Sequence, residues 1–239
     1  MFNAPMSLQR AQYLISALDI SPNDRVLDIG CGDGLFLKHI ALSNQIIGIG
    51  VDNDEALIDA AITDWSQPES AITVGFVCED ALSYSQKQKP VDIAISIGSE
   101  FVFGGYRELL QVAHKILKPN GKLLVGTIYW KQTPPPDYLV LMNGENAYFD
   151  LSTTVELAHD AGYLPLEVHR SNDDEWDIFE SRHTRKRYMS AIQTEQSELQ
   201  DRAWSWQSGY LKWGMVTMGF CFLILQKIDN VSSHNEDSA

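Results

Sequence analysis

The chain has 239 residues and a formal net charge of −14 at pH 7, from 32 Asp and Glu against 18 Lys and Arg. This length is enough for one well-buried domain. Such an acidic surface repels phosphate backbones, so we expect no nucleic-acid partner. The three cysteines lie far apart without metal-ligand spacing, which predicts reduced thiols, no metal site and a cytoplasmic location.

Predicted strands and helices alternate over the first 130 residues. Apolar residues recur at helical spacing over residues 7–18, and the sequence SPNDR ends this first helix. Asp52 or Asn53 is expected to cap the third helix, and KPNG is expected to end the fourth. The segments that follow are strands at 26–30, 45–52, 72–80, 91–98 and 122–130, and helices at 35–42, 54–65 and 105–117.

The second half departs from simple alternation. Three consecutive prolines within residues 131–139 predict neither a regular helix nor a central strand there. Ser152 is expected to cap the next helix, and Gly162 to follow its end. The remaining segments are a helix at 152–162, a strand at 163–170, two helices within about 171–213, a last strand at 219–228 and a disordered tail at 231–239.

The pattern predicts an α/β fold, with a doubly wound, seven-stranded, mostly parallel sheet. Residues 1–230 are expected to form one domain, and residues 171–213 a helical lid over the carboxyl ends of the strands, because so long an insertion is rarely an idle loop. No signal peptide is expected, and the longest apolar run is too short to cross a bilayer. We therefore expect no membrane partner.

The sequence VLDIGCGDG, residues 26–34, follows the first predicted strand and indicates a ligand-binding loop. Gly30 and Gly32 fit the dinucleotide pattern G-x-G-x-x-G, but the third position is Leu35. Asp28 would repel a pyrophosphate, whereas it would attract a cation. This combination favours S-adenosylmethionine, which carries a sulfonium and an ammonium and no phosphate.

VLDIGCGDG resembles the first motif of the class I S-adenosylmethionine-dependent methyltransferases, and the similarity extends over most of the chain, including a poorly characterised small-molecule-type branch. The resemblance implies a Rossmann-like fold and S-adenosylmethionine as the cofactor. It assigns Asp52 to the ribose hydroxyls, Asp80 to the adenine amino group, and the end of the fourth strand to the methionine end. The implied cofactor-binding residues are Asp28, Gly30, Cys31, Gly32, Asp52, Asn53, Asp80, Ala81 and Ile97.

The acceptor side is predicted from position alone. Glu100 follows the fourth strand, where donor and acceptor should meet, and is the candidate catalytic acid; an exposed loop acid is the alternative. Tyr129 and Trp130 end the fifth strand, and Trp176 lies in the aromatic lid, so all three are candidates for the acceptor pocket. Packing into the core is the alternative for these aromatic residues.

The predicted function is methyl transfer from S-adenosylmethionine to a small-molecule acceptor by in-line displacement. The fourth strand ends in IGSEF and lacks the Asn/Asp-Pro-Pro-aromatic motif of methylation on base or glutamine amino groups. The alternatives are a non-catalytic S-adenosylmethionine-binding module and an NAD(P)-dependent oxidoreductase. The basic run at 181–188 is interpreted as a solvated helix face, with attraction of an acidic substrate as the alternative. The acceptor, the methylated atom and the oligomeric state stay open.

Overall fold

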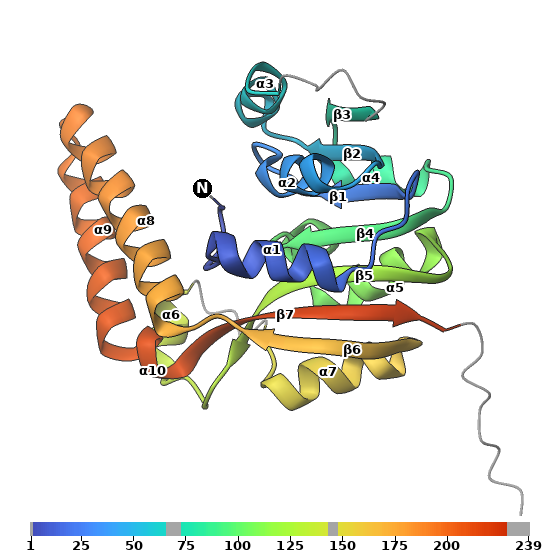
Figure 1. Ribbon diagram of the computed structural model, residues 1–239. Coiled ribbons are helices and arrows are strands. Elements are labelled where there is room, and N and C mark those ends of the chain that lie inside the picture. Colours follow the sequence, from blue (N-terminus) through green and yellow to red (C-terminus); the bar gives the residue numbers. More distant parts are fainter. Residues whose placement is uncertain (1, 66–72, 143–147, 229–239) are drawn as a thin grey trace, which may run out of the picture.

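A single mixed sheet runs through the computed structural model, which describes residues 2–65, 73–142 and 148–228 (Figure 1). The strand order is β3-β2-β1-β4-β5-β7-β6. The pairs are parallel except those of β7, which is antiparallel to both β5 and β6. The strands are β1 (Arg25–Ile29), β2 (Ile47–Asp52), β3 (Thr73–Cys78), β4 (Val91–Ile97), β5 (Leu117–Trp130), β6 (Tyr163–Arg170) and β7 (Met218–Lys227).

Helices cover both faces of the sheet, as the predicted doubly wound fold requires (Figure 1). Helices α1 and α2 pack on one face, and α4, α5 and α7 on the other. The described helices are α1 (Leu8–Ala17), α2 (Leu35–Ser43), α3 (Glu55–Thr63), α4 (Ala81–Gln86), α5 (Tyr106–Ile116), α6 (Pro136–Leu141), α7 (Leu151–Asp160), α8 (Asp173–Gln193), α9 (Ser197–Gly209) and α10 (Met215–Thr217), with a 3₁₀ turn η1 (Glu100–Phe103) and a π-helical turn η2 (Tyr210–Gly214).

The burial pattern of the last two strands follows their places in the sheet. Strand β7 lies between β5 and β6, and its first eight residues are all buried because helices or the N-terminal segments cover both faces. Strand β6 is the edge strand, and its residues alternate between buried or half-buried and exposed. The period of two on β6 is therefore a direct consequence of one covered face.

Two of the predicted helix caps are wrong by one or two residues. Helix α3 is capped by Asp54, whose Oδ1 accepts hydrogen bonds from the backbone N–H groups of Ala56 and Leu57. Asp52 and Asn53 lie before this cap and are left to line the site. Helix α7 is capped by Asp150, which accepts from the Thr153 N–H, whereas Ser152 lies inside the helix.

The structure also corrects two loop predictions. Residues KPNG do not separate α5 from a later strand, because β5 begins at Leu117 and pairs with Val91 before a bulge in the ladder. The proline-rich segment does contain a helix: α6 begins at Pro136, where a proline fits because the first helical N–H needs no partner within the helix. The predicted tail at 231–239 lies outside the described residues.

The insertion between β6 and β7 is the predicted pair of helices. Helices α8 and α9 pack side by side as a hairpin that stands beside the carboxyl ends of the parallel strands (Figure 1). Arg187 lies over the ring of Trp206, and the Trp206 indole N–H donates to Glu180 across the hairpin. These contacts hold the two helices together and leave the other side of α8 facing the sheet.

Candidate functional site

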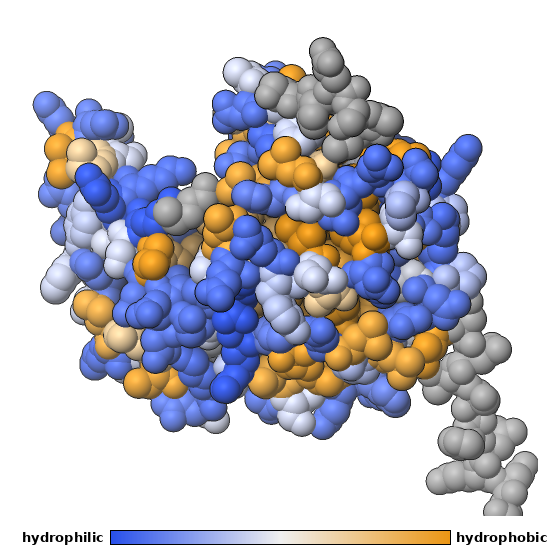
Figure 2. All heavy atoms as spheres, viewed as in Figure 1, coloured by the Kyte–Doolittle hydropathy of each residue, from blue (hydrophilic) through white to orange (hydrophobic). Residues whose placement is uncertain are grey.

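A cavity of about 900 Å³ lies between the carboxyl ends of β1, β2 and β4 and the helix α8. Its wall also includes the N-terminal residues Phe2, Asn3, Ala4 and Met6, and Phe2 packs edge-on against Phe36 of α2. Figure 2 shows the surface hollowed between the α8–α9 hairpin and the body of the molecule. This volume lies at the upper end of the roughly 300–1,000 Å³ usual for small-molecule sites.

The glycine loop after β1 forms the floor of this cavity. Gly30 has a φ of +73°, and a Cβ there would lie 2.5 Å from the Ser99 Cβ, so only glycine fits. Gly32 has a φ of +56°, lines the cavity and has no atom within 4 Å of its Cβ position. A side chain at Gly32 would therefore take space from the cavity and not from the protein core.

Asp52 is held by the loop that it faces. Its Oδ2 accepts from the Gly32 N–H at 2.9 Å, and its Oδ1 accepts from the Asp54 N–H at 3.0 Å. Each carboxylate oxygen keeps a further lone pair for a ligand in the cavity. Asp52 is thus a fixed acceptor at the end of β2.

Asp28 is the most buried acid of the cavity wall, with 4% of its surface exposed. Burial, and next the negative charge of Asp52, raise the pKa of Asp28 to about 7. Within the described residues no hydrogen bond to its carboxylate compensates for this burial. A positive charge in the cavity would therefore favour the ionised form of Asp28.

The structure brings most of the predicted cofactor-binding residues to one cavity. Burial raises the pKa of the Cys31 thiol, which favours its protonated form. The predicted residues in the cavity wall are Asp28, Gly30, Cys31, Gly32, Asp52, Asn53, Ala81 and Ile97.

Asp80 and Glu100 do not lie in this wall. Asp80 is exposed and caps α4, where the hydrogen bond from the Ser83 N–H lowers the pKa of its carboxyl. Glu100 is buried next to the cavity-lining Ser99, and its Oε1 accepts from Thr127 at 3.0 Å. Burial raises the pKa of Glu100, and no hydrogen bond to its Oε2 occurs among the described residues.

The three predicted acceptor aromatics lie in the core and not in the cavity wall. The Tyr129 ring packs over Gly219 of β7, where a Cβ would come within 2.5 Å of it. Trp130 meets the Tyr138 ring edge-on, and Trp176 packs among Tyr210 and Phe220. Large rings at these positions bury more apolar surface when they pack between elements of the core than when they line an open cavity.

The cavity-facing side of α8 was predicted only in part, because attraction of an acidic substrate was the alternative for the basic run at 181–188. Phe179, Arg182, His183, Lys186 and Met189 line the cavity together with Arg185. Their spacing of three, four and seven residues puts them along one side of a helix, and this spacing was visible in the sequence. The interpretation of residues 181–188 as a solvated helix face did not consider that the carboxyl ends of the strands lie opposite this helix.

The described residues offer neither a metal site nor a membrane span. Among them, no three His, Cys, Asp or Glu side chains gather as metal ligands would. None of the helices in the described part of the chain combines the length and apolar character needed to cross a bilayer.

Comparison with known proteins agrees with this geometry. A family model described as a methyltransferase domain matches residues 26–121. The uncharacterized protein YjhP of Escherichia coli K12 is 27% identical over 192 residues, which cover 78% of this chain and 77% of that protein. Phosphoethanolamine N-methyltransferase 3 of Arabidopsis thaliana is 24% identical over 232 residues, and the match covers 87% of this chain but 44% of that protein.

The fold has a close match among solved structures. The crystal structure of an S-adenosylmethionine-dependent methyltransferase from Geobacter sulfurreducens, in complex with S-adenosylhomocysteine, superposes with a TM-score of 0.84 at 24% identity, over 95% of this chain and 93% of that one. The family match runs from β1 through the glycine loop and Asp52 into β5. Residues 26–121 match the methyltransferase-domain family model, and the chain as a whole has the Rossmann-like methyltransferase fold.

Proposed function

We propose that this protein binds S-adenosylmethionine in the described cavity and transfers its methyl group to a small-molecule acceptor. The observation that carries the proposal is the glycine loop lying between two carboxylates, Asp28 and Asp52, at one end of a cavity with room for a second ligand. An NAD(P)-type pyrophosphate would meet these negative charges at close range, which disfavours the oxidoreductase alternative.

The residues present fit the proposed cofactor. The open space at Gly32 gives a ligand access to the loop backbone. The free lone pairs of Asp52 suit two neighbouring hydroxyl groups, which we assign to the ribose. Asp28 offers a negative charge to a cationic group. Asn53, Ala81 and Ile97 supply further wall contacts. Asp80 directly precedes the cavity-lining Ala81 and caps α4 through its Oδ1, and we keep it as the proposed acceptor for the adenine amino group.

The chain's own contribution is to bind and to align. When bound, S-adenosylmethionine supplies an electrophilic methyl on a sulfonium, and the methyl–sulfur electron pair stays on sulfur, giving S-adenosylhomocysteine, as the acceptor's nucleophile takes the methyl. Such a displacement depends chiefly on alignment, for which the fixed Asp52 and the rigid glycine loop are suited. We expect the acceptor to meet the methyl group near the end of β4, where Ile97, Gly98 and Ser99 line the cavity.

A small-molecule acceptor is supported by the cavity and by the relatives' names. A hollow of about 900 Å³ between sheet and hairpin suits two small ligands. The matched relatives include proteins named for methylation of phosphoethanolamine and for ubiquinone biosynthesis, which are chemistries of small molecules.

The proposal is tested in two steps. Isothermal titration calorimetry of the purified chain with S-adenosylmethionine, and separately with NAD⁺, should give binding of the former and none of the latter. The chain is then incubated with isotope-labelled donor and a small-metabolite extract, and a product heavier by one labelled methyl group should form. Binding without a product in extracts and a chemically diverse set of acceptors would favour a non-catalytic binding module.

Glu100 stays a candidate for handling the acceptor's proton. We expect Glu100→Gln to lower kcat more than it weakens cofactor affinity, because the amide keeps the shape and the Thr127 bond but cannot take a proton. Exposed Glu108 of α5 supplies the control Glu108→Gln, which should leave both quantities unchanged. Unchanged turnover in Glu100→Gln with the true acceptor would remove Glu100 from the reaction.

A further inference from the structure

The charged groups of the cavity are sorted by sign onto opposite walls. The acids that line it, Asp28, Asp33, Asp52 and Asp54, all come from the ends of β1 and β2. The basic side chains that line it, Arg182, Arg185 and Lys186, all come from α8. Because the chain as a whole carries −14, a wall with three cations is a local reversal of its charge.

The cations of α8 are selected by face and not by the composition of the helix. Helix α8 has acids at Asp173, Asp174, Glu175, Asp177 and Glu180, and none of these described residues lines the cavity. The cavity-facing side instead carries the three cations, His183 and two apolar side chains. The opposite side packs against α9 through Arg187 and Trp206.

These cations have no ion-pair partner in the described part of the chain. The described ion pairs involve other basic residues, such as Arg10 and Lys118, and Arg187 is occupied over the Trp206 ring. Arg182, Arg185 and Lys186 are exposed at the cavity, so they remain available to a ligand. Arginine forks and a lysine ammonium are the groups with which proteins bind carboxylates and phosphates.

His183 adds no negative or titrating group to this wall. Its ring packs on Phe179 with centroids 4.4 Å apart. Burial, and then the charges of Arg187, Lys186 and Arg182, lower the pKa of His183, so the imidazole is neutral at neutral pH. The positive charge of the wall therefore comes from the arginines and the lysine.

We propose that the methyl acceptor carries an oxyanion, a carboxylate or a phosphate, and that Arg182, Arg185 and Lys186 bind it. This inference rests on the proposed function for the role of the occupant. The acidic wall suits the cationic donor, and the basic wall suits an anionic acceptor. The positively charged donor and the negatively charged acceptor would therefore lie next to each other in the cavity. The wall thereby selects among small molecules by the charge at one end.

The experiment measures oxyanion binding to the chain loaded with S-adenosylhomocysteine. Inorganic phosphate, acetate and neutral acetamide are titrated at constant ionic strength, and binding is followed by nuclear magnetic resonance. Phosphate or acetate should bind the parent chain at least about tenfold more tightly than the double variant Arg182→Gln/Lys186→Gln. The tighter of the two probes identifies the class of oxyanion, and acetamide should show no difference between chains.

The matched control is Arg202→Gln, which removes an exposed arginine from α9 outside the cavity wall and should leave probe binding unchanged. Equal binding of phosphate and acetate to the parent and the double variant would overturn the inference, as would an equal loss in Arg202→Gln. If the double variant fails to fold, as judged by circular dichroism, Arg182→Gln alone should still weaken binding, and no weakening there would overturn the inference.

Failure of the proposed function is separable from failure of this inference. If the parent chain does not bind S-adenosylhomocysteine, the assignment of the cofactor is wrong. The same titrations of phosphate and acetate on the unloaded chain and its variants then still decide whether α8 binds an oxyanion.

Discussion

Asp28 shows how a single residue carries both a cost and a function. Its carboxyl is buried at the end of β1 within the field of Asp52, and its pKa is raised to about 7. A buried anion without a partner is unfavourable, so the site is better balanced when a cation occupies the cavity. Asp28 therefore favours the binding of a cationic ligand and does not itself stabilise the fold.

This pKa leads to a pH-dependent affinity. A cationic ligand lowers the pKa of Asp28, so binding near pH 7 should release part of a proton, and affinity should fall by up to about tenfold per pH unit below 7. Calorimetry with S-adenosylmethionine at pH 6 and 8, in two buffers of different ionisation enthalpy, measures both effects. Asp28→Asn should abolish the proton release. Persistence of the release in that variant would assign it to another group.

Asp52 is the residue for which the cofactor prediction is sharpest. Asp52→Ala removes an acceptor fixed by the Gly32 and Asp54 N–H groups, and we expect S-adenosylmethionine to bind about 30-fold more weakly or worse. The control is Asp59→Asn on the exposed side of α3, which should bind as the parent does. Parent-like calorimetry of Asp52→Ala would refute the ribose assignment.

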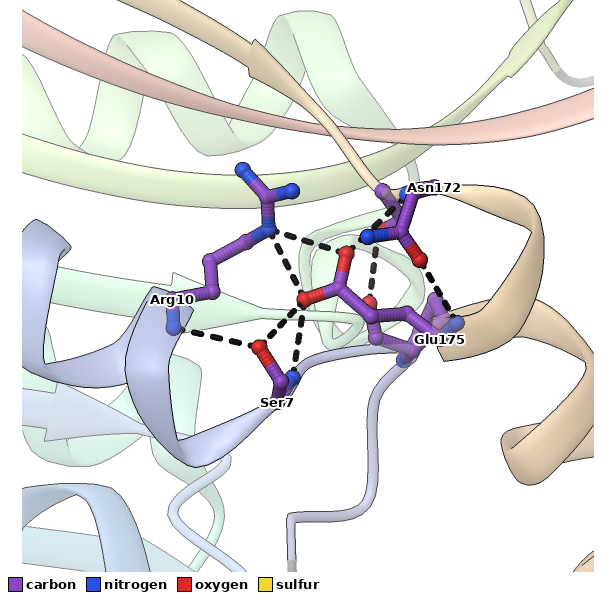
Figure 3. Close-up of polar contacts among 6 residues, drawn as sticks. Ser7, Arg10, Asn172 and Glu175 are labelled. Atoms are coloured by element: carbon purple, nitrogen blue, oxygen red, sulfur yellow. Dashed lines mark hydrogen bonds and ion pairs between the residues drawn. The ribbon is translucent and has the colours of Figure 1, made fainter.

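At the scale of elements, one carboxylate joins the N-terminal helix to the hairpin. Glu175, in the first turn of α8, accepts from the Ser7 N–H and hydroxyl and pairs with Arg10 at 3.0 Å (Figure 3). It also completes a capping box with Asn172. Since both α8 and the N-terminal residues before α1 line the cavity, this cluster fixes two of its walls.

The Glu175 cluster should be a measurable source of stability. Glu175→Ala leaves Arg10 and the Ser7 N–H without their acceptor, and we expect the free energy of unfolding to fall by about 2–3 kcal/mol at pH 7. Urea unfolding measures it. Asp174→Ala, an exposed acid in the same helical turn, should cost under about 1 kcal/mol. An equal loss of unfolding free energy in Glu175→Ala and Asp174→Ala would show that the effect comes from removing a negative charge in this helical turn and not from the contacts of Glu175.

The Glu175 contribution should depend on pH in a defined direction. Burial alone would raise the pKa of Glu175, but hydrogen bonds from Arg10, Ser7 and Asn172 outweigh it and hold the pKa below its ordinary value of 4.5. A carboxyl with a lowered folded pKa stabilises the fold above its unfolded pKa. The difference between the parent and Glu175→Ala should therefore shrink as the pH falls below about 4.5.

At the scale of the molecule, the cavity joins the sheet, the N-terminal segment and the hairpin, so a ligand in it should stabilise the whole fold. S-adenosylhomocysteine at 100 times its Kd should add about 2.7 kcal/mol and raise Tm by roughly 5–10 °C. Differential scanning fluorimetry measures this, with NAD⁺ as the control that should not shift Tm. A matching shift with NAD⁺ would contradict the charge argument at the glycine loop.

The local pattern of the chain determined much of this protein. Alternating apolar strands and amphipathic helices predicted the seven strands and their approximate bounds, because each element buries its own face. The glycine loop was predicted because it directly follows the first strand in the sequence, and the role of Asp52 was predicted from the resemblance to the methyltransferase family. Helix caps were less predictable, since Asp52, Asn53 and Asp54 are chemically similar, and only backbone geometry distinguishes them.

Tertiary structure alone decided which side chains face the cavity. From the sequence, Trp130 and Trp176 could line the acceptor pocket or pack in the core. In the structure both are buried in the core. The sequence indicated a solvated helix face for the cations of α8. The structure shows that they line a cavity opposite Asp28 and Asp52, at the carboxyl ends of β1 and β2. The physical reason is that a side chain's identity sets its chemistry, whereas its neighbours come from other elements, some of which, such as β1 and α8 around the cavity, lie more than a hundred residues apart in the chain.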